Sequence, residues 1–199
     1  SMVDSVLLLV DAVEGPMPQT RFVTRKAFEN KLNPILMVNK IDRDGARPDW
    51  VIDEVFELFD QLGATEEQLD FPVVVGSAMQ GIAGPSRDDI GSDLSYLLDL
   101  IVDQVPPPQV EESGPIQMQI SALDYNSYVG LIGLGRITRG EIRKGQSVAV
   151  VNAEGQVKKG RILQVMGFSG LSRVEIESAS AGDIVCVCGI DGLKISDTL

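Results

Sequence analysis

The chain has 199 residues, 44% of them hydrophobic, which is enough to bury the core of one domain or of two small ones. Its 17 lysines and arginines face 29 aspartates and glutamates, so at a net charge of -12 it repels nucleic acid and anionic lipid at long range, and any contact with RNA must be local. The sequence holds no histidine, which excludes serine–histidine catalysis, cysteine–histidine catalysis and histidine metal sites from this chain.

Cysteine usage and hydropathy favour a reducing compartment. Cys186 and Cys188 are too few for the disulfide framework of a small secreted domain and too close in an extended segment to pair well, so we expect both to be buried. The longest apolar run, residues 6–10, lies between Asp4 and Asp11 and follows no basic leader. It predicts neither a membrane span nor a signal sequence, and we expect a cytoplasmic protein without a membrane partner.

Charge divides the chain into two unlike parts. Residues 1–110 carry 8 basic and 19 acidic side chains, whereas residues 111–199 carry 9 basic and 10 acidic ones. Between them, three consecutive prolines and a polar stretch up to Pro115 cannot continue a helix. We predict an α/β domain over residues 1–105, a proline-rich linker over residues 106–115 and an all-β domain over residues 116–199.

The first part alternates short apolar runs with helical periodicity. In chain order we expect a strand at 5–10, a helix opened by Pro18, a strand at 35–38, a helix at about 50–62, a strand at 71–76 and a helix at 94–105. The strands are continuously apolar, which indicates a parallel sheet covered by helices on both faces.

The second part has no convincing helical stripe. Strand-like segments at residues 116–123, 130–137, 147–152, 157–166 and 183–188 are separated by turns that contain glycine. This spacing predicts a small antiparallel β-barrel. We place residues 125–128 in the turn between its first two strands.

Polar residues follow the second strand directly, as Asn39-Lys40-Ile41-Asp42. They therefore lie at the carboxyl end of a parallel sheet, where open α/β folds bind ligands. An ionised Asp42 accepts two hydrogens and matches the adjacent N1–H and N2–H donors of guanine, a pair that adenine does not offer. Asn39 can donate to the N7 and O6 side of the base and tie neighbouring loops together, and the stem of Lys40 can lie across the base. By itself the tetrapeptide could also be an ordinary polar turn.

A second loop reaches the same rim of the sheet. Residues 76–81, Gly-Ser-Ala-Met-Gln-Gly, follow the next strand, and their small side chains let backbone N–H groups approach a ligand. The Ala78 N–H can donate to guanine O6, which adenine replaces with a donating amine. Because both loops follow neighbouring strands, we predict a guanine site rather than two structural turns. Its residues are Asn39, Lys40, Asp42, Ser77, Ala78 and Met79.

The two motifs are similar to the base-recognition motifs of GTPases. Four longer strings resemble the TypA/BipA family of translational GTPases, and the resemblance covers essentially the whole chain. They are GPMPQTRFVT from Gly15, DRDGARPDW from Asp42, LDFP from Leu69 and LDYNSYVG from Leu123. The resemblance implies that residues 1–105 are the second half of a P-loop-type GTPase domain and that residues 116–199 are an elongation-factor-like barrel. Met79-Gln80 stands where the family often has Leu-Asn, and methionine still offers an apolar cover to the base.

The resemblance also implies GTP or GDP as the ligand, magnesium in the full-length protein, and GTP hydrolysis on the ribosome by that protein. Hydrolysis needs a phosphate loop with a lysine, a hydroxyl on magnesium and a group that positions water, which in the family is a histidine. The chain carries none of these, so we expect a fragment that is inactive alone, without catalytic residues or metal ligands. The alternative is a ribosome or RNA interaction module without useful nucleotide binding. A dinucleotide enzyme would need a glycine-rich fingerprint in the first strand–helix turn, which is absent.

Two surfaces are candidates for partners. The second part contains a run of basic residues, which the resemblance assigns to ribosomal RNA and which could equally be a solvated barrel face. These residues are Arg136, Arg139, Arg143, Lys144, Lys158, Lys159, Arg161 and Arg173. Residues 6–10 predict a strand buried on both faces whose natural neighbour is absent from the chain. We therefore expect an exposed apolar sheet edge through which the chain self-associates.

Overall fold

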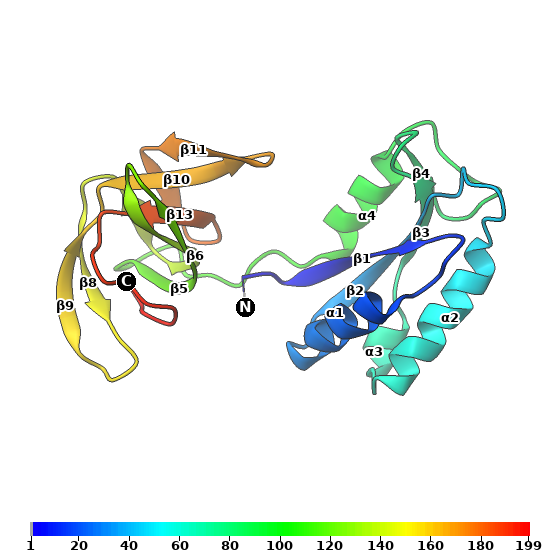
Figure 1. Cartoon of the computed structure of the whole chain (residues 1–199), viewed down its shortest axis with the longest axis horizontal. Helices are drawn as coiled ribbons and strands as arrows, with labels where there is room; N and C mark the ends of the chain where they lie inside the picture. Colours follow the sequence, from blue (N-terminus) through cyan, green and yellow to red (C-terminus); the bar gives the residue numbers. More distant parts are fainter. Residues whose placement is uncertain (1) are drawn as a thin grey trace. The chain divides into compact units, whose positions relative to one another are not determined.

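The computed structural model describes residues 2–199 and contains two separately packed units, residues 3–107 and residues 108–199 (Figure 1). The first unit is a sheet covered by helices, and the second is built from antiparallel strands. The predicted fold class is thus confirmed. None of the described helices is both long enough and apolar enough to cross a membrane.

A four-stranded sheet in the order β1-β2-β3-β4 forms the centre of the first unit. β1 (Ser5–Asp11), β2 (Asn33–Asn39) and β3 (Val73–Ser77) are parallel, as predicted, and β4 (Ile82–Gly84) returns antiparallel to β3. β4 was not predicted, because three residues are too few to show a periodicity. The register pairs Asp11 with Asn39 and Asn39 with Gly76, so the carboxyl ends of three strands lie in one row.

Helices cover the two faces of this sheet unequally. α1 (Pro18–Glu29), α2 (Pro48–Gln61) and the short α3 (Glu66–Leu69) pack on one face, around an aromatic centre in which Phe59 contacts Phe28 and Phe71 edge-on. α4 (Ser95–Gln104) packs on the other face, against residues of β2, β3 and β4. Both α1 and α2 begin with proline, whose fixed φ suits the first helical position.

β1 differs from its prediction. The apolar run 6–10 predicts burial on both faces, but only Leu8 and Val10 are buried, whereas Leu7 is 37% and Leu9 is 56% exposed. The reason is that β1 is the edge strand and the apolar cluster under α4 includes none of its residues. The described chain therefore presents an apolar sheet edge, as the sequence predicts.

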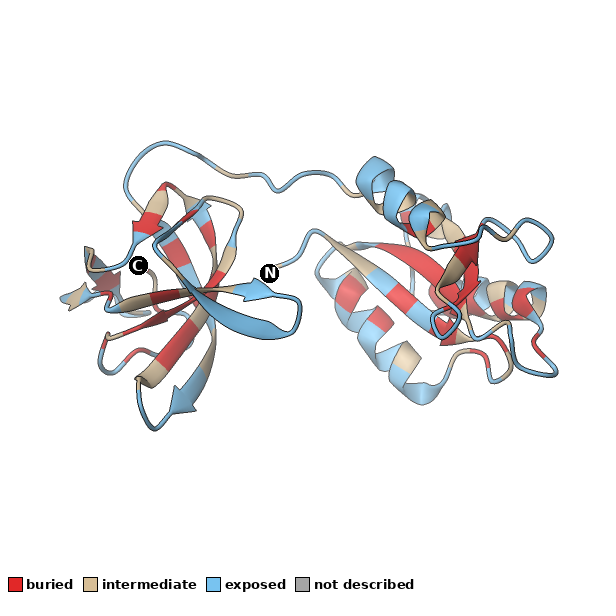
Figure 2. Cartoon of the chain, turned by 90° about the horizontal axis from the view of Figure 1, so that it is seen from above, coloured by how far each residue is buried: buried red, intermediate tan, exposed pale blue. Residues whose placement is uncertain are grey.

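In the second unit, antiparallel strands surround a large apolar core (Figure 2), and a smaller buried cluster includes Cys186 and Cys188. Five strands form a sheet in the order β11-β10-β13-β6-β5, and β12 pairs with β7 and β8 with β9. The strands are β5 (Gln117–Asn126), β6 (Gly130–Arg139), β7 (Glu141–Arg143), β8 (Ser147–Val151), β9 (Val157–Arg161), β10 (Gln164–Ser169), β11 (Ser172–Ile176), β12 (Ser178–Ser180) and β13 (Ile184–Cys188). Side chains from most of these strands and from the C-terminal segment meet in the core.

The predicted strand at 157–166 is two strands, β9 and β10. The Ile162 N–H donates to the Gln146 carbonyl, and the Leu163 N–H donates to the Cys188 carbonyl, so the chain changes its pairing partner at this point. Cys186 and Cys188 are free and buried in one cluster on the same face of β13, as predicted. The turn between β5 and β6 lies at residues 127–129, so the prediction of 125–128 is shifted, because Tyr125 and Asn126 are the last residues of β5.

Candidate functional site

Two loops meet at the carboxyl ends of β2 and β3. The first continues from Asn39 into a turn in which the Arg43 N–H donates to the Lys40 carbonyl at 3.1 Å. The second is the hairpin loop 78–81 between β3 and β4. The Ile41 N–H donates to the Gly76 carbonyl at 3.3 Å and links the two. The structure thus brings the predicted segments 39–42 and 77–79 side by side.

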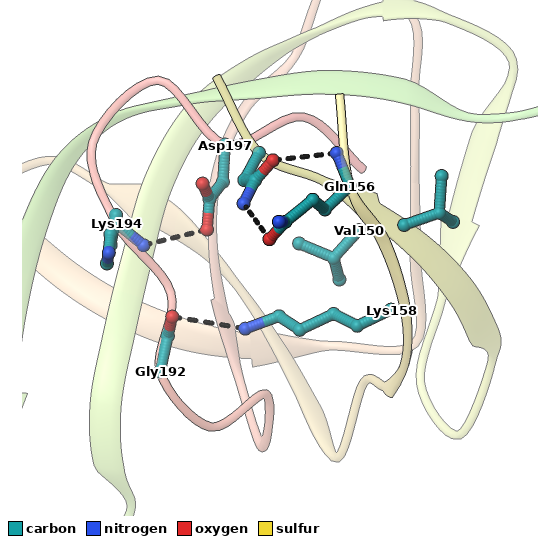
Figure 3. A pocket seen from close by; sticks show the side chains of 8 residues that line it. Val150, Gln156, Lys158, Gly192, Lys194 and Asp197 are labelled. Atoms are coloured by element: carbon teal, nitrogen blue, oxygen red, sulfur yellow. Dashed lines mark hydrogen bonds between the residues drawn. The ribbon is translucent and has the colours of Figure 1, made fainter. Parts of the chain in front are cut away.

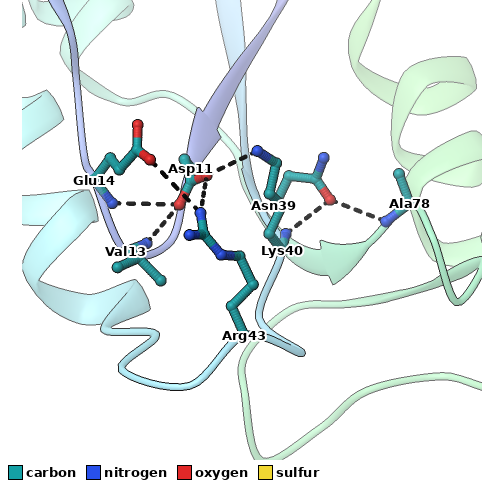
Figure 4. A network of polar contacts seen from close by, with 7 residues as sticks. All are labelled: Asp11, Val13, Glu14, Asn39, Lys40, Arg43 and Ala78. Atoms are coloured by element: carbon teal, nitrogen blue, oxygen red, sulfur yellow. Dashed lines mark hydrogen bonds and ion pairs between the residues drawn. The ribbon is translucent and has the colours of Figure 1, made fainter.

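The side chain of Asn39 joins these loops (Figure 4). Its Oδ1 accepts the Lys40 N–H at 2.8 Å and the Ala78 N–H at 2.9 Å. The Asn39 side chain therefore ties neighbouring loops together, as the sequence predicts. Its Nδ2 amide makes no hydrogen bond with any described residue and is left as a donor. The Ala78 N–H, which was expected to donate to guanine, is held by Asn39 in this structure.

The other predicted residues have unlike surroundings. Asp42 is exposed in its turn, and its carboxylate has no hydrogen bond or ion pair with the described residues. Met79 is 84% exposed in the hairpin loop. Ser77 is fully buried, and its Oγ accepts the Gln80 N–H at 3.2 Å, so its side chain shapes the loop. The groups of the two loops that remain open to a ligand are therefore Asp42, Met79 and the amide nitrogen of Asn39.

Gly76 is required by the close approach of β4. A Cβ atom at this position would lie 2.4 Å from the Ile82 carbonyl oxygen, a distance that only a backbone shift could relieve. The small residue therefore serves the pairing of β3 with β4, which carries the second loop.

Lys40 and Arg43 are tied to a carboxylate outside the predicted set (Figure 4). Asp11 is the last residue of β1, and its Oδ2 lies 2.9 Å from the Lys40 Nζ and 2.9 Å from the Arg43 Nη1. Its Oδ1 accepts the backbone N–H groups of Val13 at 2.8 Å and Glu14 at 3.3 Å. The rule that selected the two loops could have found Asp11, because it ends the neighbouring parallel strand.

These contacts hold the Asp11 carboxylate in its ionised form. Burial alone would raise the pKa of Asp11, but hydrogen bonds from Lys40 and from the Val13 and Glu14 backbone lower it from 3.8 to about 2. A carboxyl whose pKa is lower in the folded state stabilises that state above its unfolded pKa. The contribution is lost as the pH falls toward the folded value.

At least four of the predicted basic residues of the second unit already face carboxylates. Arg139 pairs with Glu111, Arg143 with Glu141, Lys144 with Glu175, and Arg173 with Asp124. Arg161 donates to the Gly145 carbonyl. Lys159 has no hydrogen bond or ion pair with a described residue. The excess of positive charge seen in the sequence is therefore partly neutralised by neighbouring strands.

Lys158 lies in a cavity of about 310 Å³ in the second unit (Figure 3). Its Nζ donates to the Asp191 carbonyl at 2.9 Å and to the Gly192 carbonyl at 3.1 Å. On the same wall, the Lys194 N–H donates to the Asp197 carboxylate at 2.9 Å. The Lys158 ammonium thus holds the segment at residues 191–192, which gives it a structural contribution that Lys159 lacks.

Comparison with known proteins assigns the chain to a class. The family model of the elongation factor Tu GTP binding domain matches residues 1–107, and that of elongation factor Tu domain 2 matches residues 130–199. The chain therefore belongs to the family of the elongation factor Tu GTP binding domain.

Individual relatives narrow this class. The chain is 58% identical to the large ribosomal subunit assembly factor BipA of Haemophilus influenzae, 57% to that of Escherichia coli K12 and 51% to that of Buchnera aphidicola. Each match covers 100% of this chain and 32% or 33% of the relative, so the chain spans about a third of the length of the curated relatives it matches. The resemblance to the TypA/BipA family is thereby confirmed.

We expect Asp11→Asn to lower the free energy of unfolding of the first unit by about 1 kcal/mol at pH 7, because the isosteric amide removes the charge that Lys40 and Arg43 face. The difference should shrink to about half at pH 3, since protonation in the unfolded state already weakens the unsubstituted chain there. Urea unfolding followed through the fluorescence of the single tryptophan, Trp50, measures both values. An equal difference in the free energy of unfolding at pH 7 and pH 3 would contradict the lowered pKa of Asp11.

Proposed function

We propose that residues 1–105 are the guanine-recognition half of a translational GTPase domain, joined by residues 106–115 to an elongation-factor-like barrel at residues 116–199. The observation that supports this most directly is the pair of loops joined by Asn39 at the ends of β2 and β3. Membership of the elongation factor Tu GTP binding domain family supports it independently.

The chemistry of the open groups suits guanine. The exposed Asp42 carboxylate accepts the N1–H and N2–H donors as a bidentate pair, and the free Nδ2 of Asn39 donates to N7. The Lys40 stem and Met79 supply apolar surface for the faces of the base. The Ala78 N–H reaches guanine O6 only as a three-centre bond shared with Asn39. Adenine would set a donating amine against this N–H and leave Asp42 without its pair.

The full-length protein would bind GTP and hydrolyse it with magnesium, whereas this chain alone would not. Hydrolysis depends on a phosphate cradle, magnesium ligands and a group that positions water. The chain has no histidine, and its described residues include no group of three or more cysteine, aspartate or glutamate side chains that could hold a metal ion. The exposed groups of the two loops thus fit the base of GTP or GDP.

The ribosome is the partner we propose, with the cytoplasm as the place of action. The relatives are named large ribosomal subunit assembly factors, and basic residues of the second unit such as Lys159 are free to meet RNA phosphate. The alternative is an interaction module without useful nucleotide binding, and the occupied Ala78 N–H favours it. Ribosome binding that survives substitution of Asp42 would support this alternative.

Base selectivity tests the guanine site. The chain should bind GDP more tightly than ADP, and Asp42→Asn should shift the preference to xanthosine diphosphate, because xanthine carries an oxygen where guanine carries the amine. Calorimetric titration of each nucleotide measures this, with Asp44→Asn as the control because Asp44 is exposed in the same loop without a hydrogen bond or ion pair to a described residue. If none of the nucleotides binds the unsubstituted chain, the interaction module is the better account.

Charge reversal tests the binding of ribosomal RNA. Lys158→Glu and Lys159→Glu should each weaken sedimentation of the chain with ribosomes. Each should also reduce the steepness of the salt dependence. The slope of log affinity against log salt concentration should fall in magnitude by about 1 for every phosphate that the variant no longer neutralises. Lys159→Glu is the decisive variant for RNA binding. Lys158→Glu also removes hydrogen bonds to the Asp191 and Gly192 carbonyls, so it can weaken binding by disturbing the local structure. Arg25→Glu, on α1, is the matched control in the first unit. A salt slope unchanged by Lys159→Glu would overturn this part of the proposal.

We also propose that the chain self-associates through β1, whose edge and exposed Leu7 and Leu9 are unpartnered among the described residues. Sedimentation velocity should show a fraction of dimer that increases with protein concentration. Leu9→Lys should lower this fraction, so that the chain sediments as a monomer. Leu98→Lys, at an equally exposed position of α4, is the control. A monomer at every concentration would contradict the proposal.

A further inference from the structure

Asp11 is a well-fixed carboxylate that base recognition does not itself use. Its side chain is 12% exposed, while those of its partners Lys40 and Arg43 are 54% and 44% exposed. The backbone N–H groups of Val13 and Glu14 bind its other oxygen, so the carboxylate is held by the main chain that follows β1. A rigid anchor of this kind restrains the flexible cations that bind it.

The two cations stand at the two ends of one turn. The Arg43 N–H donates to the Lys40 carbonyl, and both side chains then converge on the same Asp11 oxygen. Lys40 also has a φ of 69°, in the left-handed region that side chains disfavour. The turn therefore needs restraint from outside, and Asp11 supplies it at both ends.

Asp42 lies inside this turn, between the two clamped residues. Its own side chain has no bond to a described residue, so its direction depends on the backbone that carries it. The ammonium of Lys40 is anchored toward β1, which fixes the path of the stem that would cover the base. A site whose groups are placed before the ligand arrives binds more tightly, because less freedom is lost on binding.

We propose that Asp11 is a positioning residue of the guanine site, which clamps the Lys40–Arg43 turn and so orients Asp42 and the Lys40 stem for a guanine nucleotide. This inference rests on the proposed function of the two loops. It adds a residue from a third strand, β1, to a site that the base contacts confine to β2 and β3.

The test combines nucleotide titration with amide hydrogen exchange of the ligand-free chain. Asp11→Asn should weaken GDP binding roughly fivefold and speed exchange of the Arg43 amide, whereas Asp44→Asn should do neither. If Asp11 acts through Lys40 and Arg43, adding Asp11→Asn to a variant that already carries Lys40→Met and Arg43→Met weakens GDP binding no further. A residue with only a general effect on stability would instead give additive losses.

Each result has one meaning. Unchanged GDP affinity in Asp11→Asn, or a further loss when Asp11→Asn is added to the variant lacking both cations, would overturn the inference even if exchange of the Arg43 amide is faster. An unsubstituted chain that does not prefer GDP over ADP would overturn the proposed function. In that case, the rate of hydrogen exchange of the Arg43 amide, compared between Asp11→Asn and the unsubstituted chain, still shows whether Asp11 restrains the turn. Should Asp11→Asn fail to fold, Arg43→Met removes one arm of the clamp and must itself weaken GDP binding for the inference to stand.

Discussion

The candidate site depends on one side-chain oxygen, the Oδ1 of Asn39, which accepts an N–H from its own loop and one from the loop after β3. The two loops are separated by more than thirty residues of sequence, and parallel strand pairing brings only their first residues together. The Asn39 amide extends that contact beyond the end of the sheet. It also decides which group remains for a ligand, because an amide whose oxygen is used twice presents its nitrogen.

The ends of three neighbouring strands each contribute different groups to the candidate site. β2 delivers the acceptor of Asp42 and the donor of Asn39, β3 delivers the hairpin loop with Met79, and β1 delivers the carboxylate that holds the Lys40–Arg43 turn. Charge is organised differently in the second unit, where four arginine or lysine side chains each face a carboxylate. Exposed ion pairs of this kind add little stability.

The fold could be predicted where burial leaves a strong periodicity. β2 and the apolar face of α2 are buried as their sequences indicate, and the parallel order follows from continuous apolar strands. Prediction failed where the outcome depends on neighbours: α4 does not cover β1, and the chain changes pairing partner at Ile162. The two loops of the candidate site could be predicted because their motifs follow strands. The ion pairs of Asp11 with Lys40 and Arg43 could not be predicted, because they depend on how side chains from two neighbouring parallel strands point toward each other.

The most direct measurement is the two-dimensional amide NMR spectrum of the nitrogen-15-labelled chain during titration with GDP and, separately, with ADP. If the two loops joined by Asn39 form a guanine site, GDP shifts the signals of residues 39–43 and 77–80, ADP leaves them in place, and the second unit is unaffected by either nucleotide. Loop signals that do not respond to GDP, or that respond equally to ADP, would contradict the account.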